Sequence, residues 1–247
     1  MPPAIGIDVG ARLLDVVALD ARGEPTDLPR RWDDPRALAA ALAERLPGAH
    51  IGVDAPLRTG EGLLRDDAYR ATIDPPPPPG KFANYRECDY QLIRRGMPLY
   101  QAPSTYDACD AWMRAGFALH DALLATGRWT LFDGAVGPPA VLEVYPFACY
   151  CALLGSRPPR KSTAAGRAAR LAALDGALGE GWCARADLAS EDAVDAAVCA
   201  LTALRFGRGE AHWVGNPREA LMVLPSPLRD RYGAPGSTTS RPADPGR

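Results

Sequence analysis

Five acidic residues occupy positions at which folding could bring their carboxylates together. They are Asp8, Asp54, Glu143, Asp192 and Asp195. Asp8 and Asp54 each end a short apolar stretch, whereas Asp192 and Asp195 are three residues apart and share one face of a predicted helix. Each acid taken alone is explained as a helix cap or a salt-bridge partner. Convergent carboxylates, however, raise one another's pKa unless a cation neutralises them, and Mg²⁺ or Mn²⁺ is the natural partner of such oxygen ligands.

A glycine stands two residues before each of the first two acids. Gly6 precedes Asp8, and Gly52 precedes Asp54. Residues two apart share a strand face, so the missing side chain lets another element of the fold pack closely beside the acid. The residues around the helical pair are also small, which permits close packing on a sheet: Ala193, Ala196, Ala197 and Ala200.

Hydrophobic periodicity and turn residues predict the elements that position these acids. Strands are predicted at residues 5–9, 14–19, 28–32, 51–54 and 141–145. Helices are predicted at residues 35–46, 87–95, 106–126, 163–178 and 191–206. This order indicates one α/β domain over residues 1–232, with three layers, a mixed five-stranded sheet and an inserted helical segment at 59–135.

Two segments are predicted to lie outside regular structure. Five consecutive prolines, Pro75 to Pro79, exclude a helix or a central strand and indicate an extended loop or arm. Residues 233–247 are almost free of apolar side chains, so we expect a disordered tail.

Composition excludes several classes of protein. The 247 residues carry a formal net charge of −2, which argues against binding to nucleic acid through bulk positive charge. The apolar runs are far shorter than the roughly 18 residues of a membrane helix, and no signal peptide is apparent at the start, so we expect a cytoplasmic protein without membrane contact. Six scattered cysteines without a Cys-x-x-Cys pair indicate packing residues rather than a disulfide framework or a zinc site.

Basic residues that could bind a substrate phosphate lie in two clusters. Lys161, Arg167 and Arg170 belong to a stretch, 157–174, in which only basic residues are charged. Arg86 lies beside the proline arm and three residues before Asp89. A phosphate clamp is one interpretation. A solvated helix face for the first cluster, and a local Arg86–Asp89 ion pair for the second, are the structural alternatives.

Six short motifs occur in an order that resembles a known family. They are Gly6-Ile7-Asp8-Val9-Gly10, Val53-Asp54-Ala55-Pro56-Leu57, Arg86-Glu87-Cys88-Asp89, Glu143-Val144-Tyr145-Pro146, Gly166-Arg167-x-x-Arg170 and Asp192-Ala193-Val194-Asp195-Ala196. Over residues 4–206 the chain resembles domain of unknown function 429, a family described as predicted RNase H-like nucleases. The first strand and last helix are also similar to RuvC-type Holliday junction resolvases. The resemblance implies an RNase H-like fold.

The same resemblance implies metal ligands. Carried over position by position, they are Asp8, Asp54, Asp192 and Asp195. The resolvases have a glutamate where this chain has Asp54, and their set has no counterpart of Glu143, which we retain as a candidate catalytic acid. Two Mg²⁺ ions about 4 Å apart can activate water and stabilise the leaving oxygen of a phosphodiester. Asp8 would then bridge both ions, with Asp54 on one ion and the helical pair on the other.

Two other functions are also compatible with the sequence. A binding module of the same fold, without catalysis, agrees with the net charge of −2. An ATP-dependent phosphotransferase has a similar first strand, and residues 133–137, Asp-Gly-Ala-Val-Gly, are a weak counterpart of its second phosphate loop. For a nuclease the partner is nucleic acid, whether DNA, RNA, a junction or a small nucleotide, and the resolvases suggest a homodimer.

Overall fold

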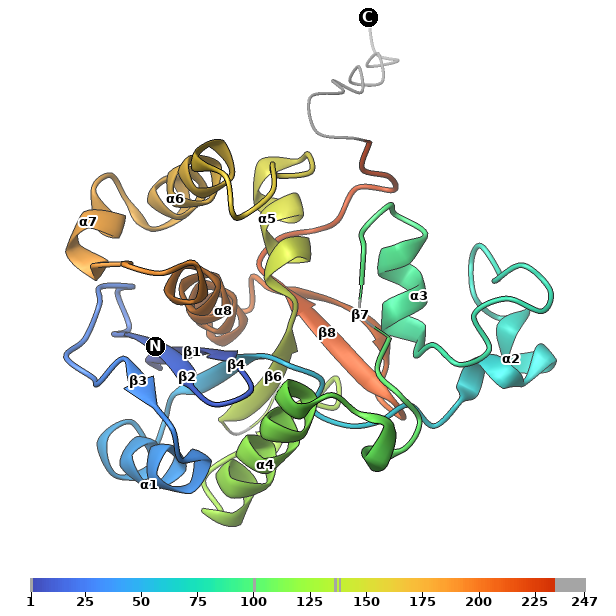
Figure 1. Cartoon of the computed structure of the whole chain (residues 1–247), viewed down its shortest axis with the longest axis horizontal. Helices are drawn as coiled ribbons and strands as arrows, with labels where there is room; N and C mark the ends of the chain where they lie inside the picture. Colours follow the sequence, from blue (N-terminus) through green and yellow to red (C-terminus); the bar gives the residue numbers. More distant parts are fainter. Residues whose placement is uncertain (1, 100, 136, 138, 234–247) are drawn as a thin grey trace, which may run out of the picture.

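A mixed β-sheet forms the centre of the molecule (Figure 1). The computed structural model describes residues 2–99, 101–135, 137 and 139–233. Within them the sheet has eight strands in the order β3-β2-β1-β4-β6-β8-β7, and β5 also pairs with β6. The strands are β1 (Ala4–Val9), β2 (Leu14–Leu19), β3 (Arg31–Trp32), β4 (His50–Asp54), β5 (Thr130–Leu131), β6 (Ala140–Val144), β7 (His212–Asn216) and β8 (Ala220–Leu224).

The five predicted strands all form and lie side by side as β3-β2-β1-β4-β6. β1 is antiparallel to β2 and parallel to β4, and β6 is parallel to β4 and to β8. The predicted count of five is too low, because β5, β7 and β8 join the same sheet. β8 is apolar and buried throughout, and such a run lacks the alternation that identifies a strand. β5 is only two residues long.

Eight α-helices and two short 3₁₀ helices occur in the described residues. They are α1 (Pro35–Arg45), η1 (Leu63–Arg65), α2 (Asp67–Arg70), α3 (Glu87–Ile93), η2 (Tyr106–Ala108), α4 (Ala111–Ala125), α5 (Pro146–Leu154), α6 (Ala164–Leu178), α7 (Trp182–Ala186) and α8 (Glu191–Gly207). Four of the five predicted helices occur with similar bounds, whereas the helix predicted at 106–126 is divided into η2 and α4, which begins only at Ala111. The Asp34 side chain caps α1, because it accepts a hydrogen bond from the Arg36 amide. None of the helices described here is long and apolar enough to cross a membrane.

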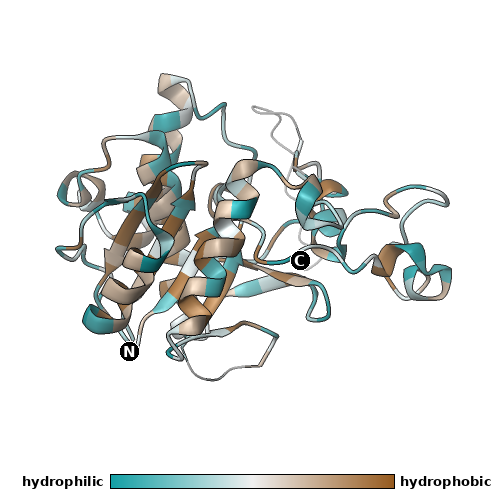
Figure 2. Ribbon diagram, turned by 60° about the horizontal axis from the view of Figure 1, so that its bottom comes forward, coloured by the Kyte–Doolittle hydropathy of each residue, from teal (hydrophilic) through white to brown (hydrophobic). Residues whose placement is uncertain are grey.

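Helices cover both faces of the sheet, which confirms the three layers (Figure 1). On one face, Val17 and Leu142 join a core with residues of α5, α6 and α8, such as Val198. On the other face, Ile7 and Val53 join residues of α1 and α4. Figure 2 shows the most hydrophobic ribbon in the strands between the helical layers. The alternating pattern of β1 therefore separates two cores, and Asp8 lies on the face of α8.

One part of the segment 59–135 projects from the domain, and the other part belongs to the helical layer and the sheet. α4 belongs to the helical layer beside α1, and β5 belongs to the sheet. The proline arm is neither helix nor strand, as predicted, and the buried Arg70 guanidinium donates hydrogen bonds to the carbonyls of Pro77 and Pro78. Glu219, also buried, accepts from the amides of Gly62 and Leu63 and thus ties this segment to the β7–β8 turn. Apart from Gly233, the predicted disordered tail lies outside the described residues.

Candidate active site

The two predicted glycines bring α8 against the sheet. A Cβ atom at Gly52 would lie 2.5 Å from the Cys199 carbonyl oxygen, and one at Gly6 would be closer still to the backbone of α8. These are distances that no real Cβ can adopt, so only glycine allows the helix to lie here. The predicted close approach is confirmed, and the approaching element is the helix that carries Asp192 and Asp195.

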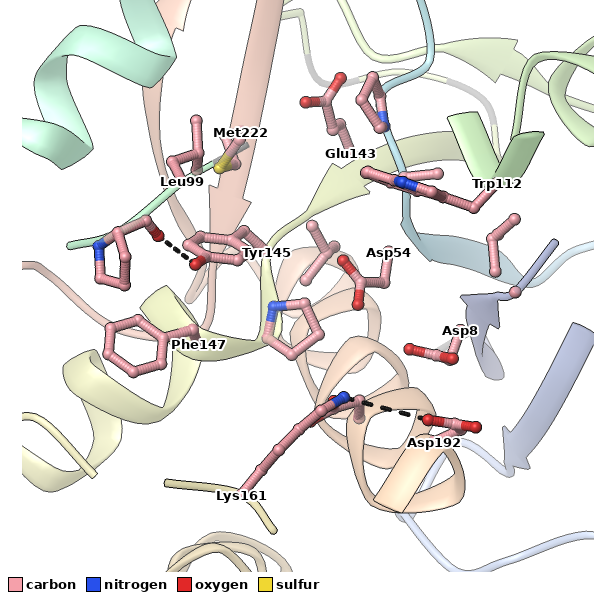
Figure 3. A pocket seen from close by; sticks show the side chains of 18 of the residues that line it. Asp8, Asp54, Leu99, Trp112, Glu143, Tyr145, Phe147, Lys161, Asp192 and Met222 are labelled. Carbon is pink, nitrogen blue, oxygen red and sulfur yellow. Dashed lines mark hydrogen bonds and ion pairs between the residues drawn. The ribbon is translucent and has the colours of Figure 1, made fainter. Parts of the chain in front are cut away.

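Three carboxylates meet where this helix crosses the strand ends. Asp8 and Asp54 are register partners on the parallel strands β1 and β4, so their side chains point to the same face. Asp195 reaches them from the first turns of α8, and oxygen atoms of the three residues all lie within 4.8 Å of one another. Figure 3 shows Asp8 and Asp54 side by side in the pocket.

Burial raises the pKa values of all three acids, and the charges of neighbouring acids add to the shift. Burial, followed by the charge of Asp195, raises the pKa of Asp8 to about 7. Burial and the charge of Asp8 raise the pKa of Asp54 well above its usual range. Burial also raises the pKa of Asp195, although Lys161 opposes the shift. In the absence of a cation the cluster therefore holds protons that an ordinary aspartate would lose.

Lys161 supplies a positive charge at the edge of this cluster. Its Nζ atom lies 2.9 Å from Oδ2 of Asp195 and 4.0 Å from Oδ1 of Asp192. Burial alone would lower the pKa of Lys161, but the charge of Asp195 outweighs it and the pKa is raised. Asp192 is exposed at the rim and is not one of the three mutually close carboxylates. Among the four predicted ligands, the structure thus separates Asp192 from the other three.

The three close residues fit a divalent cation. Carboxylate oxygens are the donors that Mg²⁺ and Mn²⁺ prefer, and Asp8, Asp54 and Asp195 supply them from three different elements. A cation would offset the mutual repulsion that now raises their pKa values. No other group of three potential metal ligands is found among the described residues.

Glu143 lines the same pocket but projects from the opposite face of the sheet, on which its register partner Val53 also lies. Its carboxylate accepts two hydrogen bonds from the Arg86 guanidinium, at 2.7 and 2.9 Å, and one from the Leu57 amide. Arg86 also pairs with Asp89 at 2.9 Å, which confirms the predicted local ion pair. Arg86 is therefore shared between two carboxylates, those of Asp89 and Glu143. Arg86 and Glu143 are both buried, and together they join β6 to α3.

The remaining predicted basic residues hold the chain that surrounds the site. Arg167 donates hydrogen bonds to the carbonyls of Leu188 and Ser190, just before α8, and does not line the pocket. Arg170 is buried, lies 5.3 Å over the Tyr150 ring and donates to the Pro159 carbonyl at 3.0 Å. Because Pro159 is two residues from Lys161, Arg170 helps to position that lysine.

A pocket of about 790 Å³ opens above the acids. Asp8 and Asp54 line one part of it (Figure 3). Asp195 lines the pocket as well. Apolar side chains line other parts of it, and we define them together as the apolar wall: Pro98, Leu99, Trp112, Tyr145, Phe147 and Met222. Sequence reasoning placed Tyr145 in a motif but did not identify this wall, because its members come from separate elements. The described residues of segment 133–137 do not line the pocket.

Comparison with known proteins gives a family but no characterised relative. No curated protein and no solved structure matches the chain. One family model matches residues 6–220, a range that contains the three close acids, Lys161 and the described strands apart from the first two residues of β1 and the last four of β8. The chain belongs to the family described as protein of unknown function (DUF429).

Proposed function

We propose that this chain is a metal-dependent nuclease of the RNase H-like class that hydrolyses phosphodiester bonds. The observation that carries the proposal is the meeting of Asp8, Asp54 and Asp195 within 4.8 Å at the side of an open pocket. The three-layer fold supports it, because the five strands expected for the RNase H-like fold lie side by side, with Asp8 and Asp54 on β1 and β4 among them.

Each residue of the site has a separate task in this proposal. Asp8, Asp54 and Asp195 would hold Mg²⁺ or Mn²⁺, and Asp192 at the rim would complete the ligand set. When bound, the metal supplies Lewis acidity at the phosphate and lowers the pKa of water. Lys161 holds Asp195 in place at 2.9 Å and adds positive charge where the anionic phosphodiester would lie. Hydrolysis then adds the water oxygen to phosphorus, breaks the bond to the leaving oxygen and transfers a proton to it.

Glu143 and Arg86 support the site from its other side. Their mutual ion pair neutralises a buried acid, so Glu143 acts by positioning β6 and the segment after β4. Arg170 positions Lys161 through the backbone of Pro159. Arg167 fixes the segment that leads into α8, and therefore the place of Asp192 and Asp195.

The direct test is cleavage of a labelled panel in the presence of Mg²⁺ or Mn²⁺. The panel contains single-stranded DNA and RNA, a hybrid duplex, a four-way junction and a dinucleotide. We expect metal-dependent cleavage of at least one substrate and its loss in Asp8→Asn. Asp15→Asn is the matched control, because Asp15 is the register partner of Asp8 on β2 but pairs with Arg31 and does not line the pocket. Equal activity in Asp8→Asn and wild type would contradict the proposal.

One observation favours a second candidate, a binding module without catalysis. Lys161 already pairs with Asp195 and so supplies part of the positive charge that a metal would bring. In that case the folded wild-type protein binds nucleic acid but cleaves nothing in the panel with either metal.

A further inference from the structure

We propose that the pocket takes a single nucleotide unit, with its base on the apolar wall and its phosphate beside the acids. This inference rests on the proposed nuclease function and specifies its substrate class. Small nucleotides and free strand ends would then be the substrates, rather than the interior of a continuous duplex.

Two parts of the pocket differ in chemistry. In one part Asp8, Asp54 and Asp195 lie beside Lys161, the arrangement proposed above for a metal ion and a phosphate. Elsewhere in the pocket the apolar wall contributes three aromatic rings. Trp112, from the first turn of α4, lies on the side of Asp54, whereas Tyr145, just after β6, and Phe147, in the first turn of α5, lie on the side away from Asp8 (Figure 3). A ligand that used both parts must join an anionic group to a flat apolar one.

The aromatic wall is held in a defined position. The Tyr145 hydroxyl donates a hydrogen bond to the Pro98 carbonyl, and the Tyr145 and Phe147 rings lie 6.0 Å apart. Trp112 is half-buried and packs against the core beside α1 and α4. Aromatic side chains on a rigid support are the usual platform for stacked bases. Inorganic phosphate has no apolar face to place on such a wall, and a sugar phosphate lacks the planar ring that stacks on it.

The distribution of positive charge limits the substrate to one or two phosphates. Arg86 and Arg170 line the pocket, but each is buried and already bonded, the first to two carboxylates and the second to backbone carbonyls. Arg160 and Lys161 are the basic residues that stand exposed at the pocket. A protein that follows a duplex backbone neutralises many phosphates with Lys and Arg. The net charge of −2 does not provide this.

The first experiment measures binding to the full chain by calorimetry with Mg²⁺ present. The ligands are a nucleoside 5′-monophosphate and ribose 5-phosphate, which lacks the base. We expect the nucleotide to bind about tenfold more tightly or better, and this advantage to disappear in Trp112→Leu. Trp112→Phe keeps a ring and should retain most of it. The control is Trp213→Leu, because Trp213 is exposed on β7 and does not line the pocket.

Two binding results would overturn the inference. One is equal affinity for the nucleotide and ribose 5-phosphate. The other is an unchanged nucleotide affinity in Trp112→Leu. Urea unfolding of each variant shows whether it is folded, and Phe147→Leu provides a second test of the wall if Trp112→Leu does not fold.

The second experiment separates this inference from the proposed function. A dinucleotide, a short single strand and a covalently closed circular duplex are compared as substrates with Mg²⁺ or Mn²⁺. Cleavage of the first two but not of the circle is the expected result. Nicking of the circle as fast as the short strand would overturn the single-nucleotide pocket and leave the nuclease intact. Nucleotide binding that depends on Trp112 without cleavage of any substrate would contradict the nuclease and leave the pocket assignment in place.

Discussion

Asp8 and Asp54 are direct register partners on the parallel strands β1 and β4, so two carboxylates project from neighbouring strands to the same face of the sheet. The glycines two residues earlier, Gly6 and Gly52, are partners as well, and α8 lies over both. The helix that needs the glycines therefore delivers Asp195 to the two strand acids. Close packing and the collection of charge at this site have the same origin.

Metal affinity is expected to depend on pH. The pKa of Asp8 is raised to about 7, so below that pH the metal must displace a proton. We expect Mg²⁺ to bind roughly tenfold more weakly at pH 6 than at pH 8, as measured by calorimetry. The raised pKa also affects the stability of the metal-free protein. The contribution of Asp8 to the free energy of unfolding is present at low pH and is lost as the pH rises through about 7. Equal affinity at both pH values would contradict the assignment of Asp8 as a ligand.

Lys161→Met is expected to increase the stabilisation that the protein gains from a bound metal ion. The substitution removes the partner of the buried Asp195 and should lower the free energy of unfolding by about 1 kcal/mol, since the lysine is half exposed. Added Mn²⁺ should then raise the melting temperature more in Lys161→Met than in wild type. Lys81, the other lysine of the chain, is exposed and outside the pocket, so Lys81→Met is the control. A smaller metal-induced shift in Lys161→Met would show that the lysine does not compete with the cation.

Gly6→Ala is expected to destabilise the fold strongly. Its Cβ would lie 1.9 Å from the Ala196 carbonyl oxygen and 2.2 Å from the Ala200 amide nitrogen, and neither backbone atom can move without displacing α8. Such overpacking costs about 1–3 kcal/mol or more. Gly48→Ala is the control, because nothing lies within 4 Å of a Cβ there. Urea unfolding measures both variants, and equal stability of Gly6→Ala and wild type would contradict the close approach of α8.

Arg86→Met is expected to cost more than the loss of an exposed ion pair. It leaves Asp89 and Glu143 buried without their shared cation, a change worth about 3–5 kcal/mol. Arg185→Met, which removes the partner of the half-exposed Glu24, should cost at most about 1 kcal/mol. Denaturant unfolding of the two variants tests this order. Similar losses of unfolding free energy in the two variants would show that Arg86 does not stabilise the buried carboxylates of Asp89 and Glu143.

Part of the site could be read from local patterns. Alternation along residues 5–9 and 51–54 placed Asp8 and Asp54 on the same face as their glycines, because a strand repeats every two residues. The spacing of Asp192 and Asp195 placed both on one side of a helix. These relationships are confirmed because they depend only on residues close in sequence.

Tertiary structure alone decided which charges meet. Glu143 follows the same strand pattern as the other acids, yet its alternation places it on the opposite face, where Arg86 pairs with it. Lys161 joins the site because its loop lies beside the start of α8. The apolar wall and the β7–β8 hairpin are likewise made by segments distant in sequence. The sequence by itself determined five of the eight described strands, five of the described helices and the shared face of Asp8 and Asp54, since these follow from local backbone geometry. Which side chains meet was decided by packing between distant segments, which no local pattern encodes.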